Sequence, residues 1–124
     1  MSIAPPAGLQ YSADHEWLDA SSPARIGITS VAAEALGDIV YVELPAVGAT
    51  VVAGAVIGEI ESTKSVSELF SPVNGTVVEV NTAVVDDPAL VNADPYGAGW
   101  LLAVDVTGTG PLLTADEYAG LNPA

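Results

Sequence analysis

The sequence predicts a mostly β-stranded domain, a sandwich or barrel-like fold with short helices at its margins. Two observations lead to this prediction. Short runs rich in valine, isoleucine and threonine recur along the chain, and glycines and prolines separate them. Half of the 124 residues are hydrophobic and 15% are charged, so a chain of this length can bury one core.

The expected strands are short, and a turn-forming residue ends most of them. They cover residues 25–29, 39–44, 51–52, 56–61, 76–80 and 100–106. Pro45 stops the second strand, and Gly54 separates the third from the fourth. The tetrapeptide Pro72-Val73-Asn74-Gly75 predicts a turn before the fifth.

Capping residues predict three short helices, over residues 31–36, 88–91 and 115–121. Ser30 can cap the first helix. Asp87 before Pro88 has the order of an N-cap followed by proline in the first turn. Thr114 and Glu117 have the spacing of a capping box, which predicts the C-terminal helix.

The ends of the chain suggest a simple domain organisation. The first residues contain two prolines and several small side chains, so we expect residues 1–10 to form a loose arm. Residues 11–124 are then a single domain.

The charge balance excludes several kinds of partner. The chain contains sixteen acidic residues and only two cationic ones, Arg25 and Lys64, so its net charge is −14. Such a surface repels nucleic-acid phosphates and anionic membranes. The longest uncharged stretch, residues 44–58, is too short to span a bilayer, and the N-terminus lacks the features of a secretory signal. We therefore expect a cytoplasmic protein without nucleic-acid or membrane partners.

The chain contains one lysine, and its position is unusual. Lys64 lies in the small polar stretch Ser62–Ser65, between two strand-like segments. We therefore expect it at the tip of a hairpin, where a modifying enzyme can reach it. The simpler interpretation, an ordinary solubilising surface lysine, stays open at this point.

Other candidates for chemistry are weaker. His15 could act as a general acid or base with Glu16 or Asp14, but a lone histidine is more often structural. No phosphate-binding glycine motif is present, and the chain has no cysteine. The carboxylates have no spacing typical of calcium loops, so no metal site is expected.

Five stretches of the chain together resemble one known family. They are Y-S-A-D-H-E-W from position 11, I-G-I-T from 26, A-L-G-D-I-V-Y-V-E-L-P-A-V-G from 35, E-S-T-K-S-V-S-E-L-F-S-P-V-N-G-T-V-V-E-V-N from 61 and L-V-N-A-D-P-Y-G-A-G-W-L from 90. The fourth resembles the lipoyl-lysine hairpin of lipoyl carrier domains, and the set resembles the H proteins of glycine cleavage systems. Biotinyl carriers fit less well, since methionines usually flank their lysine, whereas Thr63 and Ser65 flank Lys64 here.

The resemblance implies both a fold and a role. The fold is the flattened β-barrel sandwich of lipoyl and biotinyl domains, the hybrid motif, with short peripheral helices and a C-terminal helix. Lys64 would carry lipoic acid in amide linkage, and the protein would be a carrier, not an enzyme. The missing cysteines suit that role, because the cofactor supplies the sulfur chemistry.

The resemblance also implies partners. Glycine decarboxylase would load an aminomethyl group onto the lipoyl arm, an aminomethyltransferase would take it, and dihydrolipoamide dehydrogenase would reoxidise the dithiol. Lipoylating enzymes would attach the arm. A monomer is the simplest expectation.

Three glutamates are candidates for supporting roles. Glu61, three residues before Lys64, would be a recognition element for the lipoylating enzyme. Glu16 and Glu68 would pair with the amine of the loaded arm in a sheltering groove. Gly75 would hold the turn that fixes the hairpin.

Three other functions remain alternatives. An H-like relay protein could donate its lipoyl group to other lipoate-dependent systems. A hydrolase or lyase could use His15 and Glu16. A passive acidic interaction domain would never be modified at Lys64.

Overall fold

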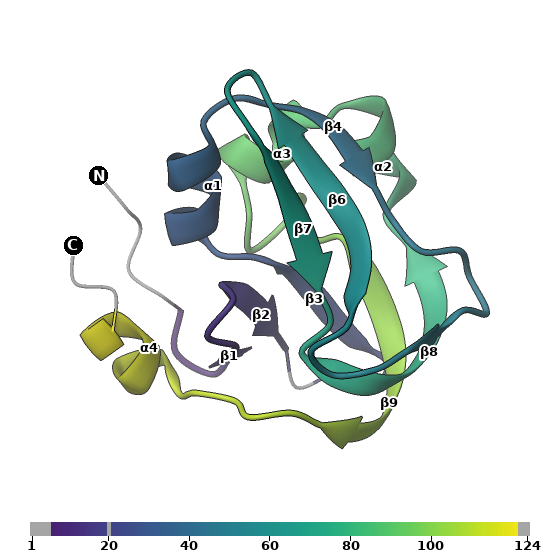
Figure 1. Cartoon of the computed structure of the whole chain (residues 1–124). Coiled ribbons are helices and arrows are strands. Elements are labelled where there is room, and N and C mark those ends of the chain that lie inside the picture. The colour runs from purple at the N-terminus through teal and green to yellow at the C-terminus, as the bar shows by residue number, and fades with distance from the viewer. Residues whose placement is uncertain (1–5, 20, 122–124) are drawn as a thin grey trace.

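Two antiparallel sheets face each other across one hydrophobic core (Figure 1). The computed structural model describes residues 6–19 and 21–121. In this part of the chain, the six-stranded sheet has the order β1 (Gln10–Tyr11), β2 (Glu16–Leu18), β3 (Ala24–Ile28), β9 (Leu102–Thr109), β8 (Val73–Val80) and β5 (Thr50–Val51). The three-stranded sheet has the order β4 (Ile39–Glu43), β6 (Val56–Ser62) and β7 (Val66–Phe70). The expected β-dominated sandwich is confirmed, and the two sheets do not close into one barrel.

The core forms because both sheets bury alternate side chains. The larger sheet contributes Ile26, Val77 and Val104, and the smaller sheet contributes Val42, Ile60 and Leu69. Successive strand residues point to opposite faces, so residues next to Ile60 and Leu69 face outward. Each fully buried aliphatic side chain stabilises the fold by about 1.5–3 kcal/mol.

The first helix, α1 (Ser30–Leu36), is capped one residue earlier than expected. Thr29 has extended backbone angles at the end of β3, and its hydroxyl accepts a hydrogen bond from the Ala32 amide at 3.3 Å. Ser30 is instead the first helical residue, and its amide donates to the Tyr96 hydroxyl at 3.0 Å. Both hydroxyl residues are good caps, so the local sequence does not choose between them.

Two short helices lie between residues 82 and 93, where the sequence predicted only one. α2 (Thr82–Asp86) was not anticipated; the Asn81 side chain caps it by accepting from the Ala83 amide. α3 (Ala89–Ala93) starts later than the expected helix, and Pro88 stands at its N-cap. Asp87 ends α2 and is not the cap of α3.

The C-terminal helix α4 (Ala115–Leu121) and its capping box are confirmed. The Glu117 amide donates to the Thr114 hydroxyl at 3.2 Å, and the Thr114 amide donates to the Glu117 carboxylate at 2.9 Å. Tyr118 on this helix packs with Tyr11 and Trp17 in a second buried cluster. That cluster attaches α4 to β1 and β2.

The expected turn at Pro72–Gly75 is wrong, because Val73 to Val80 form β8. Gly75 lies inside this strand, beside a register shift against β9. A Cβ at this position would collide with the main-chain oxygen of Asp105. The glycine is required by the close approach of β9 and does not hold a turn.

The expected N-terminal arm lies partly outside the described residues, which start at Pro6. Within the described part, the Tyr11 hydroxyl donates to the Pro6 carbonyl at 2.6 Å. Gln10 is the first residue of β1.

Candidate functional site

Lys64 lies at the tip of the β6–β7 hairpin, as the sequence predicts (Figure 1). β6 ends at Ser62 and β7 begins at Val66, so three residues form the connection. All three of these residues are exposed. The amine of Lys64 is therefore open to a modifying enzyme.

The Ser62 hydroxyl organises this tip. It accepts hydrogen bonds from the Lys64 amide at 3.3 Å and the Ser65 amide at 3.1 Å. It also lies 3.1 Å from the Ser65 carbonyl, to which it can donate. The main chain closes the same loop, since the Ser62 amide donates to the Ser65 carbonyl at 2.8 Å. None of residues 62–65 has a positive φ, so the tip does not need a glycine, and the Ser62 hydroxyl closes it as a serine turn.

The tip is also attached to the end of α1. The Thr63 amide donates to the Asp38 carbonyl at 3.0 Å. The Lys64 side chain lies over Gly37, and its Cε is 3.4 Å from the point where a Cβ of residue 37 would stand. Gly37 has φ +81°, so a larger residue would be strained there, whereas its Cβ would only make an ordinary van der Waals contact with the lysine. In this structure the lysine stem rests beside the end of α1.

Glu61 and Glu68 lie on the outward face of the smaller sheet. Their strand neighbours Ile60 and Leu69 are buried, which directs both glutamates to the opposite face. Glu68 pairs in register with Glu59, which in turn pairs with Glu43. Like charges opposite one another destabilise a sheet, so this row contributes no stability through its charges. It does give the hairpin an acidic face.

Glu16 has a different environment from Glu68. It is 2% exposed, and its carboxyl accepts the Ser12 hydroxyl at 2.6 Å. The Ser12 oxygen in turn accepts from the Glu16 amide at 3.1 Å. The Phe70 main chain is also hydrogen-bonded to this carboxyl. Burial raises the pKa of Glu16 to about 8, and the hydrogen bonds oppose only part of that rise.

The two glutamates assigned to the loaded arm therefore lie in different surroundings. Glu68 is exposed on β7, four residues from Lys64. Glu16 is enclosed beside Phe70, at the far end of the same strand. Sequence reasoning did not single out Asp38, because its contact with the tip depends on how distant segments pack, and it also missed Ser12, which lies only four residues before Glu16.

His15 is part of a structural hydrogen-bond network. Its Nδ1 lies 2.7 Å from the Tyr118 hydroxyl, which also lies 2.7 Å from the Thr29 hydroxyl. The Glu16 carboxyl, in contrast, is bonded to Ser12. These separate partners favour the structural interpretation of His15 over a His15–Glu16 catalytic pair.

The described part of the chain offers neither a metal-binding cluster nor a membrane-spanning helix. Within residues 6–19 and 21–121, no group of three or more His, Cys, Asp or Glu side chains could hold a metal ion. None of the helices in that part of the chain is long and apolar enough to cross a membrane.

The fold and the hairpin define a class of protein. A small β-sandwich that presents one exposed lysine at a hairpin tip has the architecture of a carrier domain for a covalently attached arm. A model of the family described as "Glycine cleavage H-protein" matches residues 9–121. The chain belongs to this family.

Individual relatives agree with the family match. The chain is 57% identical to the glycine cleavage system H protein of Corynebacterium aurimucosum over 123 residues, which cover 94% of this chain and 95% of the relative. It is 59% identical to the H protein of Clavibacter sepedonicus over 114 residues, with 91% and 93% covered.

A solved structure has the same fold. The crystal structure of a glycine cleavage system H protein from Mycobacterium marinum superposes with a TM-score of 0.92 at 57% identity. The match covers 96% of this chain and 99% of that one.

Proposed function

We propose that this protein is the non-catalytic lipoyl carrier of a glycine cleavage system, with the lipoyl group on Lys64. The observation that carries the proposal is the exposed amine of the chain's one lysine at the hairpin tip of a family member. The fit is chemical as well as geometric. An accessible amine can form an amide, and no protein thiol is present to exchange with a dithiolane.

A bound lipoyl group would supply a disulfide that accepts both the aminomethyl unit and electrons. The protein's part is to hold and present that arm. Ser62 keeps the tip in one shape, and the lysine stem rests beside Gly37. Acylation removes one positive charge, so the net charge would change from −14 to one unit more negative.

The partners in this proposal are glycine decarboxylase, aminomethyltransferase and dihydrolipoamide dehydrogenase. A lipoylating enzyme attaches the arm, and Glu61 on the outward face is our candidate for its recognition. Residues 11–124 would act as one carrier domain, and the system would work in the cytoplasm. Tethering supports the role, because a docked arm offers a high local concentration of cofactor.

The reach of the arm suggests which glutamate meets its end first. Lysine and lipoyl together extend on the order of 14 Å from Cα. At about 3.3 Å per strand residue, Glu68 lies roughly 13 Å along β7 and the Phe70 amide beside Glu16 roughly 20 Å. Glu68 is therefore the nearer contact for a cationic aminomethyl group. These spacings are upper limits, because Lys64 and Ser65 lie in the turn before β7, and Glu16 is reached only by an arm laid fully extended along the strand.

The test is intact mass and site mapping after incubation with a lipoate–protein ligase. Lipoylation adds one group of about 188 Da, the acid minus water. The addition should map to Lys64 and be absent in Lys64→Arg. Reconstitution with the three partner enzymes then measures glycine cleavage. An unmodified wild-type protein, or a lipoylated one that fails to restore glycine cleavage, would refute the proposal.

A further inference from the structure

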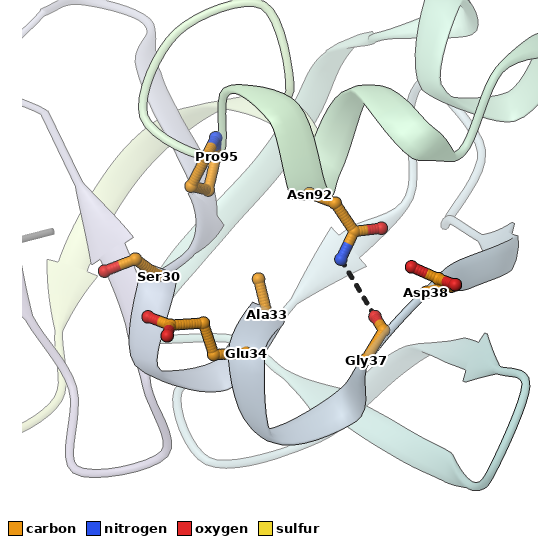
Figure 2. A pocket seen from close by; sticks show the side chains of 7 residues that line it. All are labelled: Ser30, Ala33, Glu34, Gly37, Asp38, Asn92 and Pro95. Carbon is orange, nitrogen blue, oxygen red and sulfur yellow. Dashed lines mark hydrogen bonds between the residues drawn. The ribbon is translucent and has the colours of Figure 1, made fainter. Parts of the chain in front are cut away.

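A cavity of about 280 Å³ lies between α1 and α3 (Figure 2). Its lining residues are Ser30, Ala33, Glu34, Gly37, Asp38, Asn92 and Pro95. Neither the arm nor the hairpin contributes to this lining. The cavity is therefore a feature separate from the acidic face described above.

The cavity adjoins the tip of the hairpin. Two of its lining residues, Gly37 and Asp38, are the residues that touch the tip: Lys64 lies over the first, and Thr63 is hydrogen-bonded to the second. An enzyme that forms a bond at Lys64 Nζ must bring its own surface against the tip. Because Gly37 and Asp38 contact the tip and also line the cavity, the cavity lies within reach of side chains on that surface.

Partners that act on the end of the arm meet a different constraint. The reacting sulfur atoms lie on the order of 14 Å from the Lys64 Cα, so those partners can work without covering the cavity. The acylating enzyme is the partner that must come closest to the tip.

The chemistry of the cavity suits a long cationic side chain. Ala33 and Pro95 form a small apolar surface, while the exposed residues Glu34 and Asp38 lie at opposite ends of the cavity (Figure 2). The Asn92 amide is already used, since it donates to the Gly37 carbonyl at 2.8 Å and accepts from the Ile39 amide at 2.9 Å. Glu34 also has a partner of its own, so the carboxylate that can receive a charged end is that of Asp38, while the aliphatic stem packs on the apolar surface.

We propose that this cavity receives an arginine or lysine side chain of the enzyme that acylates Lys64. The inference rests on the proposed function, because it presupposes that Lys64 is acylated. The overall charge of −14 attracts a basic partner from any side. The cavity adds a specific place for one cation next to the amine and so fixes the orientation of docking.

The test compares two double variants as substrates of a purified ATP-dependent lipoate–protein ligase, with lipoate and ATP supplied. Intact mass follows the acylation of Lys64 over time. In Glu34→Gln/Asp38→Asn we expect kcat/KM to fall about fivefold at low salt, through a higher KM, with kcat changed less than about twofold. The difference from the wild type should shrink in high salt, because ions screen the attraction.

The matched control is Glu79→Gln/Asp105→Asn, which removes two carboxylates from exposed positions on β8 and β9. Both double variants have the same net charge, and we expect the control to keep the wild-type KM. Glu34→Asp in an otherwise unchanged chain should also keep it, since the charge stays in the cavity. Thermal melting curves verify that each variant is folded.

The outcomes separate the two proposals. Equal losses in both double variants would assign the effect to overall charge and overturn the cavity inference. Unchanged kinetics in Glu34→Gln/Asp38→Asn would overturn it as well, while acylation at Lys64 would leave the proposed function intact. A wild-type protein that is never acylated would instead overturn the proposed function.

Discussion

The two ends of strand β7 differ in how strongly the surrounding structure controls the groups beside them. At the tip, Lys64 is exposed, and mainly the Ser62 hydroxyl and the Asp38 carbonyl hold the loop. At the other end, the Phe70 main chain and the Ser12 hydroxyl both bond to a glutamate that is almost fully buried.

This difference shows that groups beside the two ends of one strand can have different chemistry. The exposed end leaves an amine accessible for attachment and movement. The enclosed end changes the charge of a carboxyl, because burial raises the pKa of Glu16 to about 8 and favours its neutral form at pH 7. The exposed position leaves the Lys64 amine accessible to other molecules, whereas the enclosed position changes the protonation of the Glu16 carboxyl.

The largest expected effect is at the tip. Lys64→Arg should abolish lipoylation and carrier activity, because a guanidinium is not acylated. Its free energy of unfolding should change by less than about 0.5 kcal/mol, since the exposed side chain buries little surface. Intact mass and urea unfolding measure the two quantities. Acylation of the variant at another residue would contradict our assignment.

The Glu16→Gln variant tests how the buried carboxyl of Glu16 makes the stability of the fold depend on pH. The folded-state pKa of about 8 lies above the ordinary value of 4.5, so the folded protein binds this proton more tightly than the unfolded chain does. The contribution of Glu16 to stability is therefore most favourable at low pH and is lost as the pH rises from about 4.5 to about 8. The loss is of the order of a few kcal/mol.

Urea unfolding at pH 5 and at pH 8.5 should show a smaller pH dependence for Glu16→Gln than for the wild type. The exposed Glu68→Gln variant is the matched control, because it removes a glutamate from a solvent-exposed position on β7. If both variants reduced the pH dependence equally, general charge repulsion and not burial would be the cause.

Tyr118→Phe tests the hydrogen-bond network next to Glu16. The substitution removes the hydroxyl that partners His15 and Thr29, while the stacking on Tyr11 at 4.8 Å is retained. We expect a loss of about 1–3 kcal/mol from buried groups left without that partner. Tyr41→Phe, at an exposed position, should change stability by less than about 0.5 kcal/mol. Equal effects in the two variants would argue against the network.

The smallest effect is expected from Ser62→Ala. It removes the hydroxyl that accepts from Lys64 and Ser65, at a position partly open to solvent. We expect a loss of about 0.5–1 kcal/mol in unfolding free energy. Ser67→Ala is the control, because its hydroxyl makes only a 3.4 Å contact with the Glu68 carbonyl. A larger loss in Ser67→Ala than in Ser62→Ala would contradict the role of Ser62 in the tip.

The elements that the sequence predicted correctly are those with local causes. The strand at residues 39–44 follows from its β-branched run before a proline, and the C-terminal helix follows from its capping box. The position of Lys64 in a turn follows from small polar residues between two strand patterns. The sequence did not choose between Thr29 and Ser30 as the cap of α1, because both are good caps, and it gave no signal for α2. It placed Gly75 in a turn, because only the close approach of the distant strand β9 shows why a glycine is needed there.

The sequence by itself determined the β-rich class, the excess of acid and the single lysine at a bend, because composition and short-range propensity are properties of the chain alone. The burial of Glu16 against Phe70 and the support that Asp38 gives to the hairpin tip came from tertiary packing. Those contacts join segments far apart along the chain. The solvent exposure and hydrogen bonding of each group therefore depend on how the two sheets and α1 pack together.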